Sequence, residues 1–161
     1  MIDQQLLKKI IHECTLDDFY NDYHGISHWS RVALIGEYLA KKVSVDENVV
    51  NIFAYIHDAK RLPSGHNNIN HGEKAANLAM MLYSHGALDV SRDQLDQLTF
   101  ACQHHSDGFI TSDDITIQAC WDSDRLDMWR INMIPDPAYL QTTAAKTEEA
   151  ITFARELRSE E

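Results

Sequence analysis

Apolar residues recur every three or four positions along almost the whole chain, which is the spacing that places them on one face of a helix. No segment alternates apolar and polar residues for more than a few positions, so no strand is expected. The pattern predicts an all-α fold, a compact single-domain bundle of about six to eight helices. The main helices are expected at residues 3–13, 27–42, 45–60, 70–85, 91–106, 113–128 and 143–158.

Few residues interrupt this pattern, since the chain contains only six Gly and three Pro. The segment Thr15-Leu16-Asp17-Asp18 has the composition of a helix N-cap and predicts a short additional helix. Residues 62–70, with Pro-Ser-Gly and three Asn, are expected to form a loop, and Pro135 and Pro137 mark a turn. Repeats and linkers are absent from the pattern, which favours one domain over residues 1–161.

The charge balance restricts the partners of the protein. Lys and Arg number 14 against 25 Asp and Glu, which gives a net charge of −11. Such a surface repels a phosphate backbone, so non-specific nucleic-acid binding is not expected. A small anionic substrate would need local positive charge, and a bound metal ion can supply it.

The cysteines and the chain start indicate the compartment. Cys14, Cys102 and Cys120 are odd in number and lack C-x-x-C spacing, so we expect reduced and mostly buried thiols. Asp3 and Lys8-Lys9 interrupt any apolar start, and no apolar run approaches the ~20 residues that span a bilayer. We therefore expect a cytoplasmic protein without a membrane segment.

Several His and Asp residues lie on the apolar faces of the predicted helices. Each stands three, four, seven or eleven positions from apolar residues of its own helix and therefore shares their buried face. They are His28 (with Val32, Ile35 and Leu39), His71 (with Ala75, Leu78 and Leu82), His105 (with Leu98, Ala101 and Cys102) and Asp124 (with Ile117, Cys120 and Trp121). A fifth position, His57-Asp58, ends a helix that is apolar nearly all round.

Each of these residues has a simpler explanation when taken alone. A single His on an apolar face is most often a hydrogen-bonded core residue, and Asp124 has Arg125 and Arg130 as alternative partners. Burying a carboxylate without a partner is costly, however, and a divalent cation would satisfy the imidazoles and carboxylates together. The coincidence on five helices predicts a site for one or two ions, and manganese, iron, nickel, cobalt and zinc all accept such ligands.

The order His28, His57-Asp58 and Asp124 resembles the H…HD…D motif of the HD-domain phosphohydrolase superfamily, here as a stand-alone minimal domain. The resemblance runs from about His24 to Leu140. Five segments carry it: His-Gly-Ile-Ser-His-Trp at 24–29, His-Asp-Ala-Lys-Arg at 57–61, His-Gly-Glu-Lys-Ala-Ala at 71–76, His-His at 104–105 and Asp-Ser-Asp-Arg-Leu-Asp at 122–127.

The resemblance implies a helical bundle with a metal core at about 24–128 and a C-terminal helix at about 143–158. The residues that correspond by position to the ligands of the first ion are His28, His57, Asp58 and Asp124. Members with two ions add a later histidine and one or both of a His pair, and those places are filled by His71, His104 and His105. Asp58 would then bridge the ions, and a two-ion site is favoured.

The same resemblance implies hydrolysis of a phosphate ester by a metal-activated water, with Asp58 in the catalytic centre. Arg61 stands where family members often place a basic residue that faces the substrate phosphate, and Lys60 is an alternative for that role. The neutral explanation for both is a solvated helix end. His24, one helical turn before His28, is expected to be an extra ligand, a partner of a ligand or a substrate contact.

Other polar residues and segments carry less information. Asp107 and Asp122 have no assigned role. Asp127, three residues after Asp124, could orient a neighbouring group, but pairing with Arg130 at the surface is favoured. His12, His66 and His85 are expected to be exposed. Residues 106–110 lack the Gly-Tyr-Pro element of the branch that cleaves cyclic-di-GMP, which makes that activity doubtful. At 161 residues we also expect the chain to be too short for the extra regions of the branches acting on (p)ppGpp or dGTP.

Three functional classes remain open from the sequence. The first is a phosphomonoesterase or phosphodiesterase that acts on a nucleotide or another small phosphorylated metabolite. The second is a di-iron oxygenase on a similar scaffold, and the third is a metal- or nucleotide-binding sensor without turnover. Exposed apolar faces are compatible with a homodimer.

Overall fold

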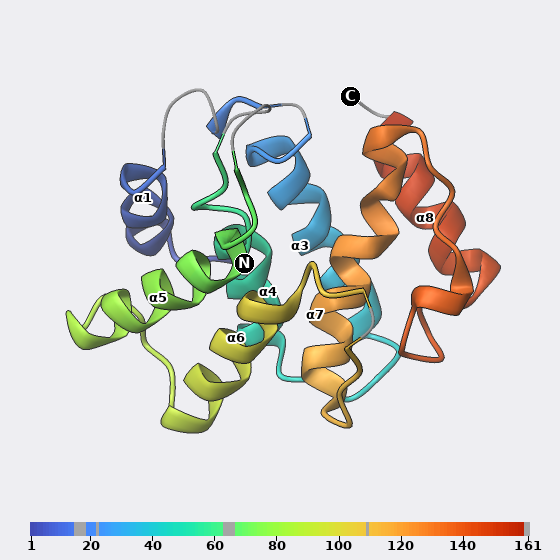
Figure 1. Ribbon diagram of the computed structural model, residues 1–161. Helices are drawn as coiled ribbons and strands as arrows, with labels where there is room; N and C mark the ends of the chain where they lie inside the picture. The colour runs from blue at the N-terminus through green and yellow to red at the C-terminus, as the bar shows by residue number, and fades with distance from the viewer. Residues whose placement is uncertain (15–18, 22, 63–66, 109, 160–161) are drawn as a thin grey trace.

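The computed structural model describes residues 1–14, 19–21, 23–62, 67–108 and 110–159, and these residues contain helices, turns and no strand (Figure 1). The α-helices are α1 (Gln4–His12), α3 (Ile26–Ala40), α4 (Glu47–Ile56), α5 (His71–Ser84), α6 (Arg92–His104), α7 (Ile115–Leu126) and α8 (Glu148–Ser159). Two 3₁₀ helices, η1 (Asp127–Ile131) and η2 (Pro137–Tyr139), follow α7. The predicted all-α class is confirmed. Within the described residues, no helix is long and apolar enough to cross a membrane.

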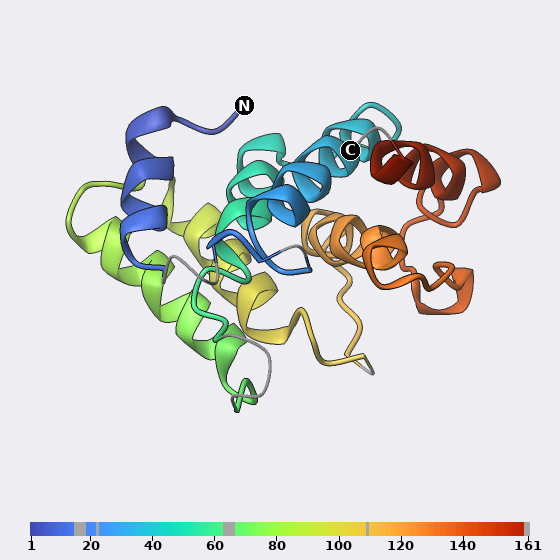
Figure 2. The same cartoon turned by 90° about the horizontal axis from the view of Figure 1, so that it is seen from above.

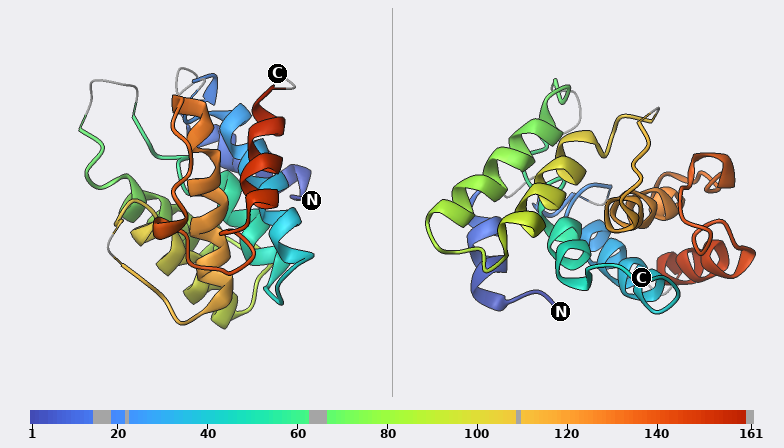
Figure 3. Two further views of the ribbon diagram at one scale, coloured as in Figure 1. Left: turned by 90° about the vertical axis from the view of Figure 1, so that its right-hand side faces the viewer. Right: turned by 90° about the horizontal axis from the view of Figure 1, so that it is seen from below.

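Helix α4 occupies the middle of the bundle (Figure 1). It packs against α3 and α7 on one side and against α5 and α6 on the other, while α8 covers α3 and η1. Views from above and below show this order, with the α5–α6 pair and α8 at opposite ends of the molecule (Figures 2 and 3). The chain therefore brings segments far apart in sequence to the C-terminal end of α4, where His57 and Asp58 follow.

Acidic and hydroxyl side chains fix where several helices begin. Asp3, Asp46 and Asp114 each accept hydrogen bonds from two backbone N–H groups in the first turn of α1, α4 and α7. Ser91 and Gln94 form a reciprocal capping box at the start of α6. Such caps satisfy backbone donors that a helix leaves unpaired at its N-terminus, each contributing about 0.5–2 kcal/mol.

The buried apolar residues form two clusters. The first core lies among α1, α3, α4, α5, α6 and α7 and includes the fully buried rings of Trp29, Phe53 and Trp121. The second core lies among α3, α7 and α8, and its buried members are Ile35, Leu39, Leu126, Leu140, Ala145, Ala150 and Ala154. Helices α3 and α7 contribute to both cores.

The structure differs from the predicted helix limits at the C-terminal end. The predicted helix 143–158 begins only at Glu148, because Thr147 accepts a hydrogen bond from the N–H of Ala150 at 3.2 Å and acts as a cap. The Thr142 hydroxyl likewise accepts the N–H of Ala145 and stabilises the turn before it. The predicted cap at 15–18 lies outside the described residues, as does part of the predicted loop 62–70.

Gly72, directly after His71, allows α5 and α6 to pack closely. A Cβ there would lie 2.7 Å from the backbone oxygens of both Cys102 and Gln103. We expect Gly72→Ala to lower the free energy of unfolding by about 1–2 kcal/mol, because the backbone clash outweighs the gain in helix propensity. Urea denaturation would measure this loss.

Gly108 provides the matched control, since a Cβ at this position meets no atom within 4 Å. Gly108→Ala should leave the free energy of unfolding within ~0.5 kcal/mol of the wild type or raise it slightly. Equal stability of the two variants would show that α5 and α6 tolerate the extra methyl group.

Candidate metal centre

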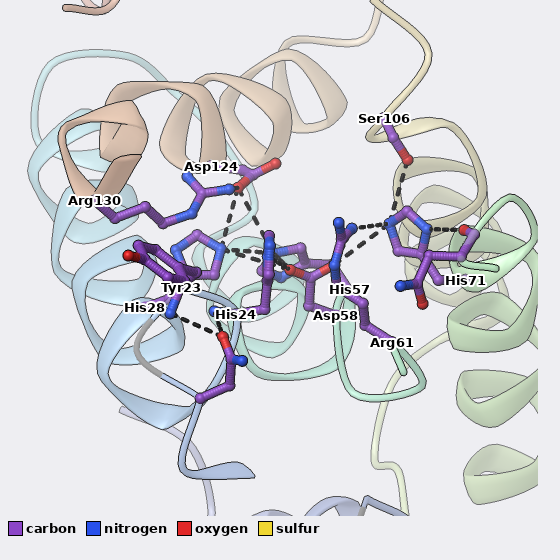
Figure 4. A network of polar contacts seen from close by, with 12 residues as sticks. Tyr23, His24, His28, His57, Asp58, Arg61, His71, Ser106, Asp124 and Arg130 are labelled. Carbon is purple, nitrogen blue, oxygen red and sulfur yellow. Dashed lines mark hydrogen bonds and ion pairs between the residues drawn. The ribbon is translucent and has the colours of Figure 1, made fainter. Parts of the chain in front are cut away.

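Asp58 lies at the centre of a buried cluster of histidines and carboxylates (Figure 4). It follows α4 by two residues, and its side chain is only 3% exposed. Its two oxygens face different groups. Oδ2 faces His28, His57 and His24, whereas Oδ1 faces His71 and His105.

The first subsite consists of His28, His57, Asp124 and the Oδ2 atom of Asp58. The Nε2 atoms of His28 and His57 lie 3.2 Å apart, and Asp124 Oδ1 lies 3.2 Å from the former and 3.7 Å from the latter. Asp58 Oδ2 lies 3.9 Å and 3.8 Å from the same two nitrogens. Three donor atoms, from His28, His57 and Asp124, all lie within 4.8 Å of one another, which is the arrangement needed to hold one ion.

The second subsite consists of His71, His105 and the Oδ1 atom of Asp58. The two Nε2 atoms lie 2.9 Å apart, and each lies 3.4 Å from Asp58 Oδ1. Helix α5 begins at His71, and His105 directly follows α6, so the close packing of these two helices brings the imidazoles together. Asp58 is therefore shared between two neighbouring groups of donors.

The other ring nitrogen of each of these histidines is held by a hydrogen-bond acceptor. His57 Nδ1 lies 3.1 Å from the carbonyl oxygens of Phe53 and Ala54. His71 Nδ1 lies 2.6 Å from the Asn68 carbonyl, and His105 Nδ1 lies 2.7 Å from the Cys102 carbonyl. A carbonyl only accepts, so Nδ1 must carry the proton and the lone pair of each neutral ring is on Nε2.

With these tautomers, the Nε2 lone pairs of neighbouring imidazoles face each other. Two Nε2 lone pairs that approach to 3.2 Å or 2.9 Å repel each other unless a cation or proton lies near them. Among the described residues, the buried Oδ1 atoms of Asp58 and Asp124 also have no hydrogen-bond partner. Converging imidazole nitrogens and orphaned carboxylate oxygens are the donors that transition-metal ions prefer. The residues present therefore fit a divalent metal.

The protonation states of His57, His71 and Asp58 also suit metal binding. Burial lowers the pKa of His57 to about 4, and burial with the neighbouring His105 lowers the pKa of His71. Both rings are therefore neutral near neutral pH. Burial alone would raise the pKa of Asp58, but the imidazoles of His57, His105 and His24 outweigh it and hold that pKa well below its usual value. The Asp58 carboxylate is therefore ionised.

The structure distinguishes Arg61 from Lys60 as a candidate for contact with the substrate. Arg61 Nη1 lies 3.3 Å from His71 Nε2 and 3.9 Å from Asp58 Oδ1, so its guanidinium borders the second subsite (Figure 4). Lys60 instead donates to the backbone oxygen and the carboxylate of Glu13, both at 2.8 Å, and does not join the cluster. Ser106 Oγ, 3.3 Å from His71 Nε2, also borders the second subsite.

His24 and His104 occupy different environments. The Asn21 side chain accepts the N–H of His24 at 3.0 Å, and this turn brings His24 Nδ1 to 3.0 Å from Asp58 Oδ2. His24 therefore joins the cluster from its solvent side. His104 lies apart from the cluster, because its Nδ1 contacts the exposed carboxylate of Asp107 at 2.9 Å and its ring packs on Phe100. Of the His pair, only His105 faces the cluster.

The expectation for Asp127 is wrong. Instead of pairing at the surface, Asp127 is fully buried and contacts His28 Nδ1 at 2.7 Å and Arg31 at 2.8 Å and 3.1 Å. Arg130 donates to the backbone oxygen of Asp127, and its Nη2 lies 3.6 Å from Asp124 Oδ1. Sequence reasoning missed Arg31 altogether, although it lies three residues after His28 and so shares its helix face.

The remaining polar residues have structural roles or lie at the surface. Asp122 is buried and accepts the backbone N–H groups of Gln141 and Thr142, at 2.8 Å and 2.7 Å, which anchors the segment after η2 to α7. His12 and His85 are exposed, as predicted, and His66 lies outside the described residues.

Comparison with known proteins supports the fold. No family model matches the chain, and no curated protein matches it. Among solved structures, a protein from an uncultured Thermotogales bacterium, described as a predicted HD superfamily hydrolase, is similar with a TM-score of 0.72 and 22% sequence identity. The match covers 98% of this chain and 87% of that one. The chain thus has the fold of an HD-domain protein, as its His and Asp order predicted.

Proposed function

We propose that the protein is a metal-dependent phosphohydrolase with a two-metal centre. The observation that carries the proposal is the central position of Asp58, whose two oxygens face two neighbouring groups of imidazole nitrogens. His28, His57 and Asp124 would hold one ion with Asp58 Oδ2, and His71 and His105 would hold the other with Asp58 Oδ1. When bound, such ions supply a deprotonated water near neutral pH and neutralise charge on a phosphoryl group.

The side chains around the centre support a phosphorylated substrate. Arg61 presents a fixed positive charge beside the second subsite, and a planar guanidinium matches phosphate oxygens in a two-pronged contact. His24 reaches Asp58 from the exposed side and would hold the bridging carboxylate in place. No other protein base is needed in this arrangement, because the attacking oxygen comes from the ion-bound water.

The overall charge favours a small substrate. At −11, the surface repels nucleic acids and other long polyanions, and local positive charge is confined to groups such as Arg61 and the ions themselves. We therefore propose that the substrate is a nucleotide or another small phosphorylated metabolite. Several apolar residues are exposed, and we propose that they could form the contacts of a homodimer.

Elemental analysis together with a phosphatase assay tests the proposal. The freshly purified wild-type protein should contain manganese, iron, nickel, cobalt or zinc, and should release phosphate from members of a panel of mono- and diesters. A chelator should stop hydrolysis, and added manganese, nickel or cobalt should restore it. A two-iron protein that consumes oxygen would indicate an oxygenase, and bound metal with no phosphate release over hours would indicate a sensor.

Arg61 and Lys60 form a matched pair for testing substrate contact. Arg61→Ala should raise KM for the phosphate ester about 10-fold or more, because it removes a charge-assisted contact beside the second subsite. Lys60→Ala should leave KM within ~2-fold, since Lys60 contacts Glu13 instead. Steady-state kinetics on both variants would measure the difference. A larger effect of Lys60→Ala would reverse the assignment.

A further inference from the structure

Asp127 occupies an unusual position behind the first subsite. It opens η1, three residues after Asp124, and is fully buried. One of its oxygens accepts from His28 Nδ1 at 2.7 Å, and Arg31 binds both oxygens, through Nε at 2.8 Å and Nη2 at 3.1 Å. The contact therefore joins α3 to the end of α7 directly behind His28.

This contact differs from those made by the other three histidines that form the two subsites. His57, His71 and His105 direct Nδ1 to backbone carbonyls three or four residues earlier in their own segments. His28 alone among these four directs Nδ1 to a carboxylate, and this carboxylate comes from a different element. A carboxylate holds the imidazole in one orientation and makes Nε2 a stronger donor than a neutral carbonyl does.

Arg31 explains how Asp127 keeps its orientation. Arg31 lies three residues after His28 on the same face of α3, so both side chains reach one carboxylate. The planar fork of a guanidinium fixes the plane of a carboxylate that it binds through two nitrogens. A buried ion pair adds little stability by itself, because the charges must leave water. Its placement behind a candidate ligand points to a role in orienting that ligand.

We infer that Asp127 and Arg31 are positioning residues that fix the orientation and Nδ1-protonated tautomer of His28, so that the first subsite binds its ion more tightly than the second. The inference rests on the proposed metal centre. The second subsite is weaker for one further reason, because it contains one shared carboxylate instead of two.

The test compares Asp127→Asn with Asp122→Asn in metal-free protein titrated with Mn²⁺. Both carboxylates are fully buried and lie near Asp124, but Asp122 accepts its hydrogen bonds from Gln141 and Thr142 instead of from a histidine of the cluster. Asp127→Asn should weaken binding of the tighter ion by ~10–100-fold and leave the weaker ion unchanged. At saturating Mn²⁺, kcat should recover more than half of the wild-type value.

Arg31→Lys provides a second variant, since lysine keeps the charge but lacks the fork. It should weaken the tighter ion by less than Asp127→Asn does, with an altered Co²⁺ absorption spectrum in the first subsite. Nitrogen-15 NMR of the metal-free wild type, at a pH where the imidazoles are neutral, should show His28 protonated on Nδ1. This last measurement requires neither a metal nor a folded variant.

The outcomes separate the inference from the proposed function. A wild-type protein that binds no Mn²⁺, Co²⁺ or other divalent ion overturns the proposed metal centre and the affinity difference with it. A wild type that binds two ions, with Asp127→Asn and Asp122→Asn giving equal affinities, overturns only the positioning role. A His28 ring protonated on Nε2 overturns that role as well.

Discussion

Asp58→Ala is expected to lose both metal ions and to reduce hydrolysis by more than the ~10–100-fold that follows loss of a hydrogen-bond partner of a metal ligand. The reason is that one carboxylate serves both subsites: Oδ2 lies 3.8 Å from His57 Nε2, and Oδ1 lies 3.4 Å from the Nε2 atoms of His71 and His105. No other carboxylate among the described residues contacts both groups.

Elemental analysis and phosphate release, measured on the same preparations, would check this result. Asp58→Asn is a useful second variant, because the amide keeps the size of the side chain but loses the charge and offers only one oxygen. Asp107→Ala is the control, since Asp107 is exposed and contacts His104 instead of the cluster. Retention of two ions by Asp58→Ala would refute the bridging role.

His105→Ala is expected to reduce hydrolysis by about 100-fold, whereas His104→Ala should change it by no more than ~2-fold. The two histidines are adjacent in sequence, but only His105 is buried, and its Nε2 atom lies 2.9 Å from His71 Nε2. We expect His105→Ala to retain the ion of the first subsite and to lose the other, so that its metal content falls from two ions to one.

Metal stoichiometry and kinetics on both variants would measure this contrast. Because each variant removes one imidazole from the same segment, general effects on folding can be compared through the thermal unfolding of the metal-free proteins. Similar losses of bound metal and of hydrolysis in the two variants would contradict the proposed second subsite. So would the retention of two ions by His105→Ala.

Helical periodicity predicted most of this fold, because burial of one face leaves a direct trace in the sequence. The inward positions of His28, His71, His105 and Asp124 follow from the same spacing, but the sequence left open which of His104 and His105 is a ligand. The late start of α8 could not be read in this way. Thr147 caps that helix through a local hydrogen bond that competes with helix extension, and residues 143–147 still carry a helical pattern.

The residues behind the site were harder to predict. Asp127 was expected at the surface because a carboxylate near Arg130 has an obvious partner in sequence, while its actual partners, His28 and Arg31, lie on a distant helix. On the sequence alone, Lys60 is an alternative to Arg61 for a similar reason. Lys60 is directed away from the cluster by its contact with Glu13. This contact depends on where α1 packs, which periodicity within one helix does not reveal.

The two apolar cores have a consequence for how the protein unfolds. Both include residues of α3 and of α7, and these helices also carry His28 and Asp124. Opening either core would therefore disturb helices that position the donor cluster. Partial unfolding that leaves the cluster intact is thus limited to peripheral segments such as α1. We expect amide protons of α3 and α7 to exchange with solvent last, and together.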